Sequence, residues 1–447
     1  MNNISRTLLA ALCIIPLLSQ TVLAQQTPTA TKPNVIFILA DDLAMGDIGP
    51  YGQTKIKTPA LDRMAAGGVR FTQGYSGTSV CAPSRASLMT GLHTGHCPIR
   101  ANREIQPEGQ KPLPGDTWTV AKLLKSGGYA TMCAGKWGMG MFDTEGSPLK
   151  MGFDNFFGYN CQRHAHSYFP DYIYENDKRI ELDGKTYAQD FIINNTLNWI
   201  RKHKDEPFFV FYAATLPHGK YEIDDLGQYE NKEDWSDQQK TYAAMVTRLD
   251  THVGQIFGLL EELNLDDNTI VFFAGDNGSA FAPDSAISQF FNSNAGLRNC
   301  KRSMYEGGLR QAFLARWPKH ITANSVCDTP IAFWDLLPTC AELSGTKIPD
   351  GVPFDGVSLL PALLKGDKLD RDTLYWELHE GKPVQAARWK DWKFVKNGFD
   401  QPMELYDLKT DAGETTNLAS RHPDIIQIGE GLLQSLRTEH PDWPLKK

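Results

Sequence analysis

Four uninterrupted apolar runs give the chain the pattern of an α/β protein. The runs cover residues 34–40, 129–134, 207–213 and 269–274. Continuous rather than alternating apolar sequence is typical of strands buried on both faces of a mainly parallel sheet. The segments with helical spacing between them are residues 58–66, 117–125, 187–202 and 236–263. The pattern predicts a large mixed, mainly parallel sheet flanked by helices, with an aromatic-rich loop over residues 153–174.

The end of the chain has a different pattern. Short alternating runs begin near residue 372 and predict a small antiparallel sheet, followed by a helix at residues 425–436. The predicted strands are residues 373–378, 384–389, 392–395 and 403–408. A chain of 447 residues is too long for one small core. We therefore predict a large α/β domain over residues 33–365 and a small α+β subdomain over residues 366–447.

The first residues have the pattern of a signal peptide. Arg6 precedes an apolar stretch at residues 8–18, and small residues lead up to Ala24. The stretch is too short for a membrane anchor, and no later segment is apolar enough to span a bilayer. We expect cleavage after Ala24, export to the periplasm or the exterior, and a polar linker at residues 25–32.

Charge and cysteine content narrow the function classes. A net charge of −8 argues against a nucleic-acid-binding protein, because such proteins carry an excess of positive charge. The cysteines are Cys13, Cys81, Cys97, Cys133, Cys161, Cys300, Cys327 and Cys340. None lies in a CxxC pattern, which argues against a zinc or thiol redox site. Those of the exported chain could pair in an oxidising compartment, although spacing does not give the connectivity.

Polar side chains follow the apolar runs where a parallel sheet binds ligands. Asp41 and Asp42 follow the first run, and Asp276 and Asn277 follow the fourth. Ligands of open α/β sheets lie outside the carboxyl ends of the strands. Two adjacent carboxylates repel each other unless a cation lies between them, so a cation site and a solvated turn are both open at this point. Lys136 follows the second run and is a candidate anion ligand.

The segment from Cys81 to Gly91 carries the most specific pattern of the chain. Pro83 suits a first helical position, which would place Cys81 at or before a helix N-terminus, where an anion is favoured. Arg85, about one turn on, could hold that anion by charge-assisted hydrogen bonds. The pattern indicates a reactive side chain beside an anion-binding corner.

The letters C-A-P-S-R at residues 81–85, followed by L-M-T-G, resemble the signature of the type I sulfatases. This family belongs to the alkaline-phosphatase-like superfamily and includes bacterial arylsulfatases and carbohydrate sulfatases. The resemblance implies that a maturation enzyme converts Cys81 to formylglycine (3-oxoalanine), whose hydrate attacks a sulfate ester. It also implies a bound calcium ion. The implied metal ligands are Asp41, Asp42, residue 81, Asp276 and Asn277, an oxygen-rich set that suits a hard cation.

The resemblance also implies further catalytic residues. They are Arg85 of the signature, Lys136 of a G-K-W motif, His218 of a P-H motif and Lys301 ahead of Y-E-G-G. The chain departs from the family at Gly138, where many relatives have a histidine that contacts the diol. His164 or His166 could fill that space.

The implied substrate is a sulfate monoester, of a galactose or N-acetylgalactosamine type of sugar. The candidate sugar contacts are Arg100, Asn102, Arg163, His164 and His166. Two alternatives stay open: a metal-dependent phosphodiesterase or phosphonate hydrolase of the same superfamily, and a non-catalytic protein that binds sulfated glycans.

Overall fold

The computed structural model describes residues 32–445 and contains a main sheet of eleven strands. The predicted signal peptide, and the linker up to residue 31, lie outside the described residues. The strand order is β12-β2-β11-β10-β1-β9-β5-β6-β7-β8, with β13 paired to β2. The strands are β1 Asn34–Ala40, β2 Val69–Tyr75, β5 Ala130–Lys136, β6 Asn155–Tyr159, β7 Tyr172–Glu175, β8 Lys178–Glu181, β9 Phe208–Ala213, β10 Thr269–Gly275, β11 Arg310–Arg316, β12 Ser325–Cys327 and β13 Ile331–Ala332.

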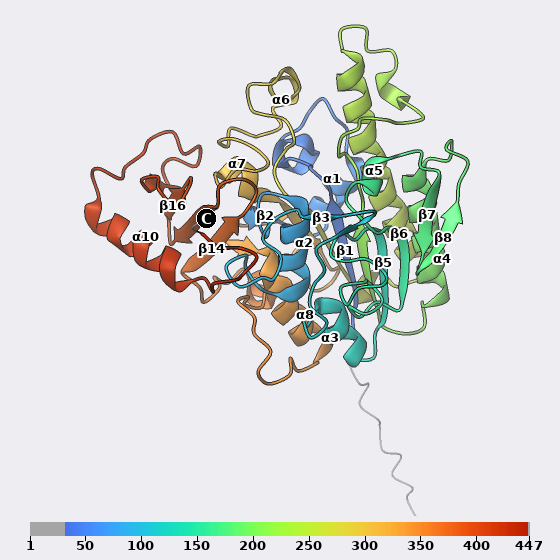
Figure 1. Ribbon diagram of the computed structural model, residues 1–447. Helices are drawn as coiled ribbons and strands as arrows, with labels where there is room; N and C mark the ends of the chain where they lie inside the picture. Colours follow the sequence, from blue (N-terminus) through green and yellow to red (C-terminus); the bar gives the residue numbers. More distant parts are fainter. Residues whose placement is uncertain (1–31, 446–447) are drawn as a thin grey trace, which may run out of the picture. The chain divides into compact units, whose positions relative to one another are not determined.

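The central strands of this sheet run parallel. β1 pairs in parallel with β9 and β10, and β5 pairs in parallel with β9 and β6 (Figure 1). β11, β7 and β8 pair with their neighbours in the antiparallel direction. The mixed, mainly parallel sheet is confirmed.

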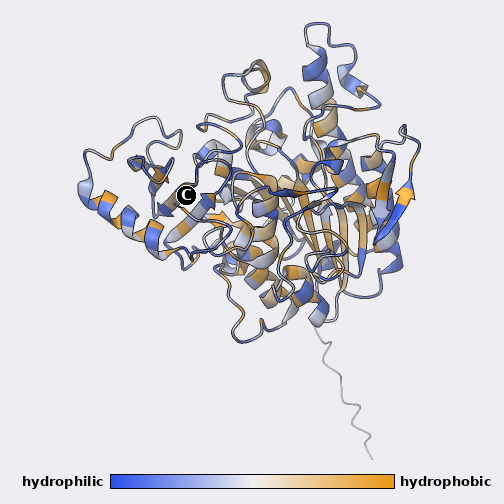
Figure 2. Cartoon of the chain, in the orientation of Figure 1, coloured by the Kyte–Doolittle hydropathy of each residue, from blue (hydrophilic) through white to orange (hydrophobic). Residues whose placement is uncertain are grey.

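Helices cover both faces of the sheet because the strands are apolar on both faces. Neighbouring residues of a strand point to opposite sides, so Val35, Phe37 and Leu39 share one core with α2, α3 and α8. Ile36 and Ile38 share a second core with α1, α4 and α5. Figure 2 shows the hydrophobic colour along these central strands. The helices are α1 Pro59–Ala66, α2 Cys81–Thr90, α3 Val120–Ser126, α4 Ala188–Lys202, α5 Asp237–Glu262, α6 Ala286–Phe291, α7 Glu306–Leu309, α8 Leu336–Ser344, α9 Leu360–Lys365 and α10 Pro423–Ser435.

A four-stranded antiparallel sheet and a helix form the C-terminal part, as predicted. Its strands are β14 Thr373–Leu378, β15 Val384–Trp389, β16 Trp392–Lys396 and β17 Glu404–Asp407, paired in that order. One face packs on α10 through Phe394 and Leu433. The other packs on the main body, where Trp376 and Val395 share a cluster with Tyr75. α9 ends at Lys365, and the division into two domains after this residue stays a prediction.

The structure differs from the sequence pattern in two places near the site. The segment 153–174 is not a loop throughout, because it contains β6 and the start of β7. β6 is short and carries Gly158, which conceals the strand in the sequence. α2 begins at Cys81, so Pro83 is its third residue rather than its first. Both positions lie in the first turn, where a backbone N–H has no helical acceptor.

Two further predictions can be compared with residues 32–445. Within this range no helix is long and apolar enough to cross a membrane. The described cysteines are unpaired, and six of the seven are buried. A short hairpin, β3 Glu104–Ile105 and β4 Gly109–Gln110, lies outside the two larger sheets.

Candidate active site

The acidic residues of the site come together because β1 and β10 are in register. Ala40 pairs with Gly275, so the residues that follow the two strands leave the sheet side by side. The Asp276 N–H donates to the Ala40 carbonyl at 2.9 Å, and the Asp42 N–H donates to Asp276 Oδ1 at 3.1 Å. Asp42 has a φ of +61°, which turns its side chain into the cluster. The predicted convergence of strand ends is what the structure shows.

Three cationic side chains compensate these carboxylates. Lys136 Nζ donates to Asp41 Oδ2 at 2.6 Å, and Lys301 Nζ donates to the two Asp42 oxygens at 2.6 and 2.8 Å. Arg85 Nη2 donates to Asp276 Oδ2 at 2.9 Å and lies 3.4 Å from Asp41 Oδ2. All of these groups are buried, and buried charges are stable only when they are paired in this way.

The pKa values of the carboxyl groups reflect this balance. Burial alone would raise the pKa of Asp41, but Lys136, and after it His218 and Arg85, hold it well below the usual range. For Asp276 burial and the neighbouring charge of Asp41 dominate, and they raise its pKa to about 7. The three carboxylates and the three cations balance in formal charge, and Asp276 is the carboxyl group whose negative charge this balance favours least.

Cys81 lies at the centre of this cluster. Its Sγ is 3.3 Å from Asp41 Oδ1 and 3.6 Å from Lys301 Nζ. His218 Nε2 lies 3.4 Å from Lys301 Nζ and 3.3 Å from Asp42 Oδ2. Burial, and then the charge of Asp41, raise the pKa of the Cys81 thiol far above its ordinary value. An unmodified Cys81 would thus be a neutral thiol, not a thiolate nucleophile.

The donor set fits a hard divalent cation. One atom each of Asp41, Asp42, Cys81 and His218 lies within 4.8 Å of the others. Asn277 is buried, and its Oδ1 has no hydrogen-bond partner among the described residues, while its Nδ2 donates to Asp42 Oδ1 at 2.7 Å. An orphaned buried acceptor beside carboxylate oxygens is the arrangement that Ca²⁺ satisfies.

A cavity of about 460 Å³ opens onto the cluster. Its lining residues are Cys81, Asn102, Glu104, Gln110, Gln162, Arg163, His166, His218, Lys301, Arg302 and Glu380. Of the predicted sugar contacts, Asn102, Arg163 and His166 are among them. Arg163 is half exposed and lies 3.1 Å from Glu104, and the His166 ring stacks on that of His218 with a centroid distance of 4.1 Å.

The other two predicted sugar contacts do not line this cavity. Arg100 is buried, with Nη1 donating to Glu377 at 2.5 Å and Nη2 donating to the Thr438 carbonyl at 2.9 Å. The His164 ring stacks on Tyr172 at a centroid distance of 4.1 Å. Arg100 therefore ties the site to the C-terminal part of the chain, and its role as a sugar contact has no support from this geometry.

Sequence reasoning missed Glu380 and Arg302. Glu380 lies between β14 and β15, where its Oε1 accepts from the Asn102 N–H at 3.2 Å and its Oε2 accepts from Arg302 Nε at 2.9 Å. Arg302 could have been noticed because it directly follows Lys301. No sequence pattern marks Glu380 as a site residue, because only the fold brings the C-terminal part of the chain against this cavity.

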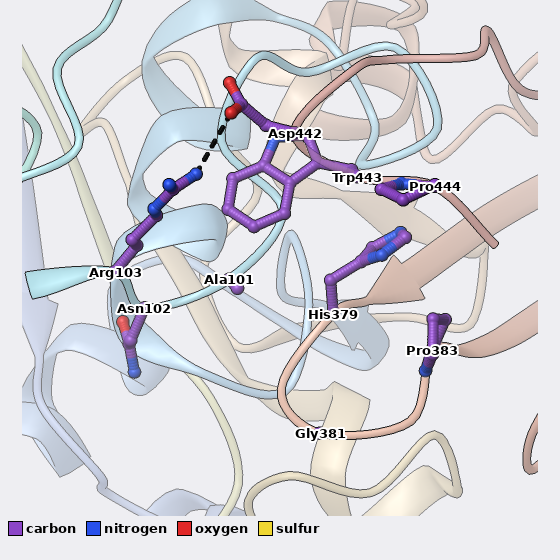
Figure 3. A pocket seen from close by; sticks show the side chains of 9 residues that line it. All are labelled: Ala101, Asn102, Arg103, His379, Gly381, Pro383, Asp442, Trp443 and Pro444. Carbon is purple, nitrogen blue, oxygen red and sulfur yellow. Dashed lines mark hydrogen bonds and ion pairs between the residues drawn. The ribbon is translucent and has the colours of Figure 1, made fainter. Parts of the chain in front are cut away.

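A second cavity of about 310 Å³ adjoins the first and shares Asn102 with it (Figure 3). Arg103 Nη1 donates to Asp442 at 3.0 Å, and the Trp443 indole N–H donates to the Pro98 carbonyl at 2.8 Å. The His379 ring lies next to the Trp443 ring, with a centroid distance of 5.8 Å. The surroundings of the first cavity are thus built from segments far apart in the sequence.

The fold and this site define a sulfatase, and the chain belongs to the sulfatase family. The family model described as Sulfatase matches residues 33–346, and the model described as N-sulphoglucosamine sulphohydrolase, C-terminal, matches residues 298–440. The chain is therefore a member of a family of sulfuric ester hydrolases. Enzymes of this family typically use formylglycine and a metal.

Particular relatives cover nearly the whole chain. Human N-acetylgalactosamine-6-sulfatase is 33% identical over 89% of this chain and 80% of the relative. An N-acetylgalactosamine-6-O-sulfatase of Bacteroides thetaiotaomicron is 27% identical over 98% of this chain and 100% of the relative. The crystal structure of Ps i-CgsB superimposes with a TM-score of 0.82 at 29% identity, covering 93% of this chain and 96% of that one. A second structure of that protein is a complex with k-i-k-neocarrahexaose.

Proposed function

We propose that this protein hydrolyses sulfate monoesters of a carbohydrate, with a galactose or N-acetylgalactosamine type of sugar as the substrate. The observation that carries the proposal is the position of Cys81, at the start of α2, against a compensated acidic cluster and in the wall of an open cavity. The names of the relatives, which refer to N-acetylgalactosamine, support the choice of sugar.

Residue 81 acts as formylglycine. A separate maturation enzyme, with its own electron acceptor, oxidises the Cys81 carbon by two electrons and removes the sulfur, leaving an aldehyde. Addition of water gives a diol. Because the thiol of Cys81 is held neutral, this conversion supplies the nucleophile that the bare residue lacks.

The charged side chains have separate roles in this proposal. A calcium ion, held by Asp41, Asp42, Asp276, Asn277 and residue 81, would supply positive charge against the sulfate oxygens. Lys301 faces the same region and binds sulfate, while Arg85 and Lys136 hold the diol in line. His218 Nδ1 donates to the Gly219 carbonyl, which leaves Nε2 as the nitrogen that acts on the substrate. In its imidazolium form His218 carries a proton on both nitrogens, and Nε2 gives its proton to the leaving oxygen.

The reaction then has two balanced steps. One diol hydroxyl passes its proton to a carboxylate of the acidic cluster, and its oxygen bonds to sulfur as the ester S–O bond breaks. The sugar oxygen leaves with a proton from His218, which becomes neutral. The second diol hydroxyl then gives its proton to His218, and the carbon–oxygen bond to the sulfate breaks. Sulfate leaves, the aldehyde forms again, and water restores the diol.

Sulfate release tests the proposal. The protein is co-expressed with a formylglycine-generating enzyme, supplied with calcium, and checked for conversion of Cys81 by peptide mass. Ion chromatography then measures sulfate from a panel of sulfated galactose and N-acetylgalactosamine sugars. We expect repeated turnover on at least one of them. Cys81→Ser should stop after at most one turnover, because a plain alcohol, once sulfated, has no second hydroxyl to expel the group.

The same assay separates the alternatives. Sustained multiple turnover by Cys81→Ser would overturn the formylglycine mechanism. A phosphodiester and a phosphonate monoester are included in the panel, and cleavage of either without any sulfate release would overturn the sulfatase function. Binding of a sulfated sugar without release, in fully converted protein, would indicate a glycan-binding role instead.

A further inference from the structure

Gln162 occupies the place where this chain lacks the family's histidine. The reason lies in the pairing of β5 with β6, in which Lys136 is opposite Tyr159. The ladder continues past both strands, as the Trp137 N–H donates to the Tyr159 carbonyl at 3.0 Å and the Gly138 N–H donates to the Asn160 carbonyl at 3.1 Å. The two segments therefore leave the sheet together.

In this structure the Gln162 side chain fills the space that a side chain at position 138 would need. A Cβ added to Gly138 would collide with Gln162 Nε2 and would lie 3.1 Å from its Cδ. The nearest neighbours of that Cβ are all atoms of Gln162, whereas His164 and His166 are not among them. Gly138 also has a φ of +75°, where a residue with a Cβ is strained. The residue that fills this space is therefore Gln162, and not His164 or His166 as expected.

The amide of Gln162 has an unused donor at the catalytic cavity. The residue is only 7% exposed, and its Nε2 has no hydrogen-bond partner among residues 32–445. The same residue lines the cavity together with Cys81, Lys301 and His218. A buried donor without a partner costs about 1–3 kcal/mol. Because Gln162 lines the cavity that also contains Cys81, a group that enters with the substrate can supply the missing acceptor.

We propose that Gln162 is a catalytic residue, whose Nε2 donates a hydrogen bond to an oxygen at the reacting centre formed by residue 81 and the sulfate. The assignment rests on the sulfatase function proposed above. An amide can donate this bond but cannot take a proton at neutral pH. Gln162 therefore stabilises charge at this place but does not act as a base, and the proton of the second step passes to His218, which lost its proton in the first step.

Two substitutions separate hydrogen-bond donation from simple space filling. Gln162→Ala removes the donor, and we expect kcat to fall about 100-fold, the loss typical of one donor to a developing oxyanion. Gln162→Glu keeps the shape but replaces the donor with an anionic acceptor facing a sulfate. We expect it to have a lower kcat than Gln162→Ala. A packing role predicts the reverse order, because glutamate fills the space and alanine does not.

Gln385→Ala is the matched control. Gln385 is also buried, but it lies in β15 and donates to the Tyr375 hydroxyl at 2.7 Å, outside the cavity. All variants are compared at full conversion of Cys81 and with their thermal unfolding measured. If wild-type protein releases sulfate and Gln162→Ala keeps kcat within twofold, or if Gln162→Glu is the more active variant, the role of Gln162 is overturned and the sulfatase function stands. If converted wild-type protein releases no sulfate from the panel, both are overturned.

Discussion

Arg85 links the two acidic strand ends of the site. Its Nε and Nη2 both donate to Asp276 Oδ2, at 3.1 and 2.9 Å, and its Nη1 donates to the Lys136 carbonyl at 2.9 Å. The side chain is fully buried. A planar fork of donors is needed to make these contacts together, and a single ammonium group cannot reproduce it.

We expect Arg85→Lys to lower kcat about 100-fold and to lower the melting temperature, because Asp276 loses part of its compensation. Sulfate release and thermal unfolding measure the two effects. Arg316→Lys is the control, since Arg316 also donates two hydrogen bonds to one aspartate, from Nη1 and Nη2 to the two oxygens of Asp266, at 2.5 and 2.7 Å, away from the cavity. Equal kcat values for the two variants would contradict the special role of Arg85.

At the scale of elements, α1 begins with a cap that another helix supplies. Thr58, the residue before α1, makes no side-chain cap. Asp250 of α5 accepts from the Ala60 N–H at 3.0 Å and from the Leu61 N–H at 2.8 Å. A carboxylate at a helix N-terminus stabilises it, but burial, with a smaller effect of Asp62, raises the pKa of Asp250 to about 6.

This pKa predicts a pH dependence of stability. In the unfolded chain the pKa of an aspartate is about 3.9, so the folded state binds the proton more tightly. The resulting stabilisation is complete below about pH 4 and is lost as the pH rises through 6. Between pH 4 and 7 the wild type should lose up to about 3 kcal/mol of unfolding free energy that Asp250→Asn does not lose. The variant should therefore gain in stability relative to the wild type as the pH rises. Denaturant unfolding at both pH values measures it, and the exposed Asp234→Asn should show no such shift.

At the scale of the whole molecule, a buried ionic cluster joins the C-terminal sheet to the main body. Lys393 of β16 donates to Glu306 of α7 at 2.8 Å and to Glu414 at 3.3 Å. Both carboxyl groups and the amine are buried. The Arg100 contact with Glu377 is a second buried pair between the same two parts.

We expect Lys393→Met to destabilise the protein by about 3–5 kcal/mol, because it removes the cation between two buried carboxyl groups. Glu306 would keep only the more distant Arg310, at 3.7 Å. The double variant Lys393→Met with Glu414→Gln should recover part of this loss. Thermal unfolding of both variants tests the expectation. A single variant as stable as the wild type would show that the cluster does not join the two parts.

The predictions from sequence succeeded for strands that their own continuous apolar residues identify, without information from the rest of the fold. The continuous apolar runs located β1, β9 and β10, and the polar residues after them located the acidic cluster. β6 was missed because a short strand that contains a glycine shows no clear alternation of hydrophobic and polar residues. The contributions of Gln162 and Glu380 depend on which segments the fold brings together, and neither the spacing nor the composition of the chain contains that information.

The burial of α2 has a consequence for the order of events during synthesis. Every residue of this helix is buried, and Cys81 is only 2% exposed. Another protein's active site cannot enclose a side chain that the folded chain covers so completely. Under the proposed formylglycine mechanism, the maturation enzyme therefore acts while residues 81–85 are still extended, before the chain folds around them. The fraction of converted protein would then depend on the relative rates of modification and folding.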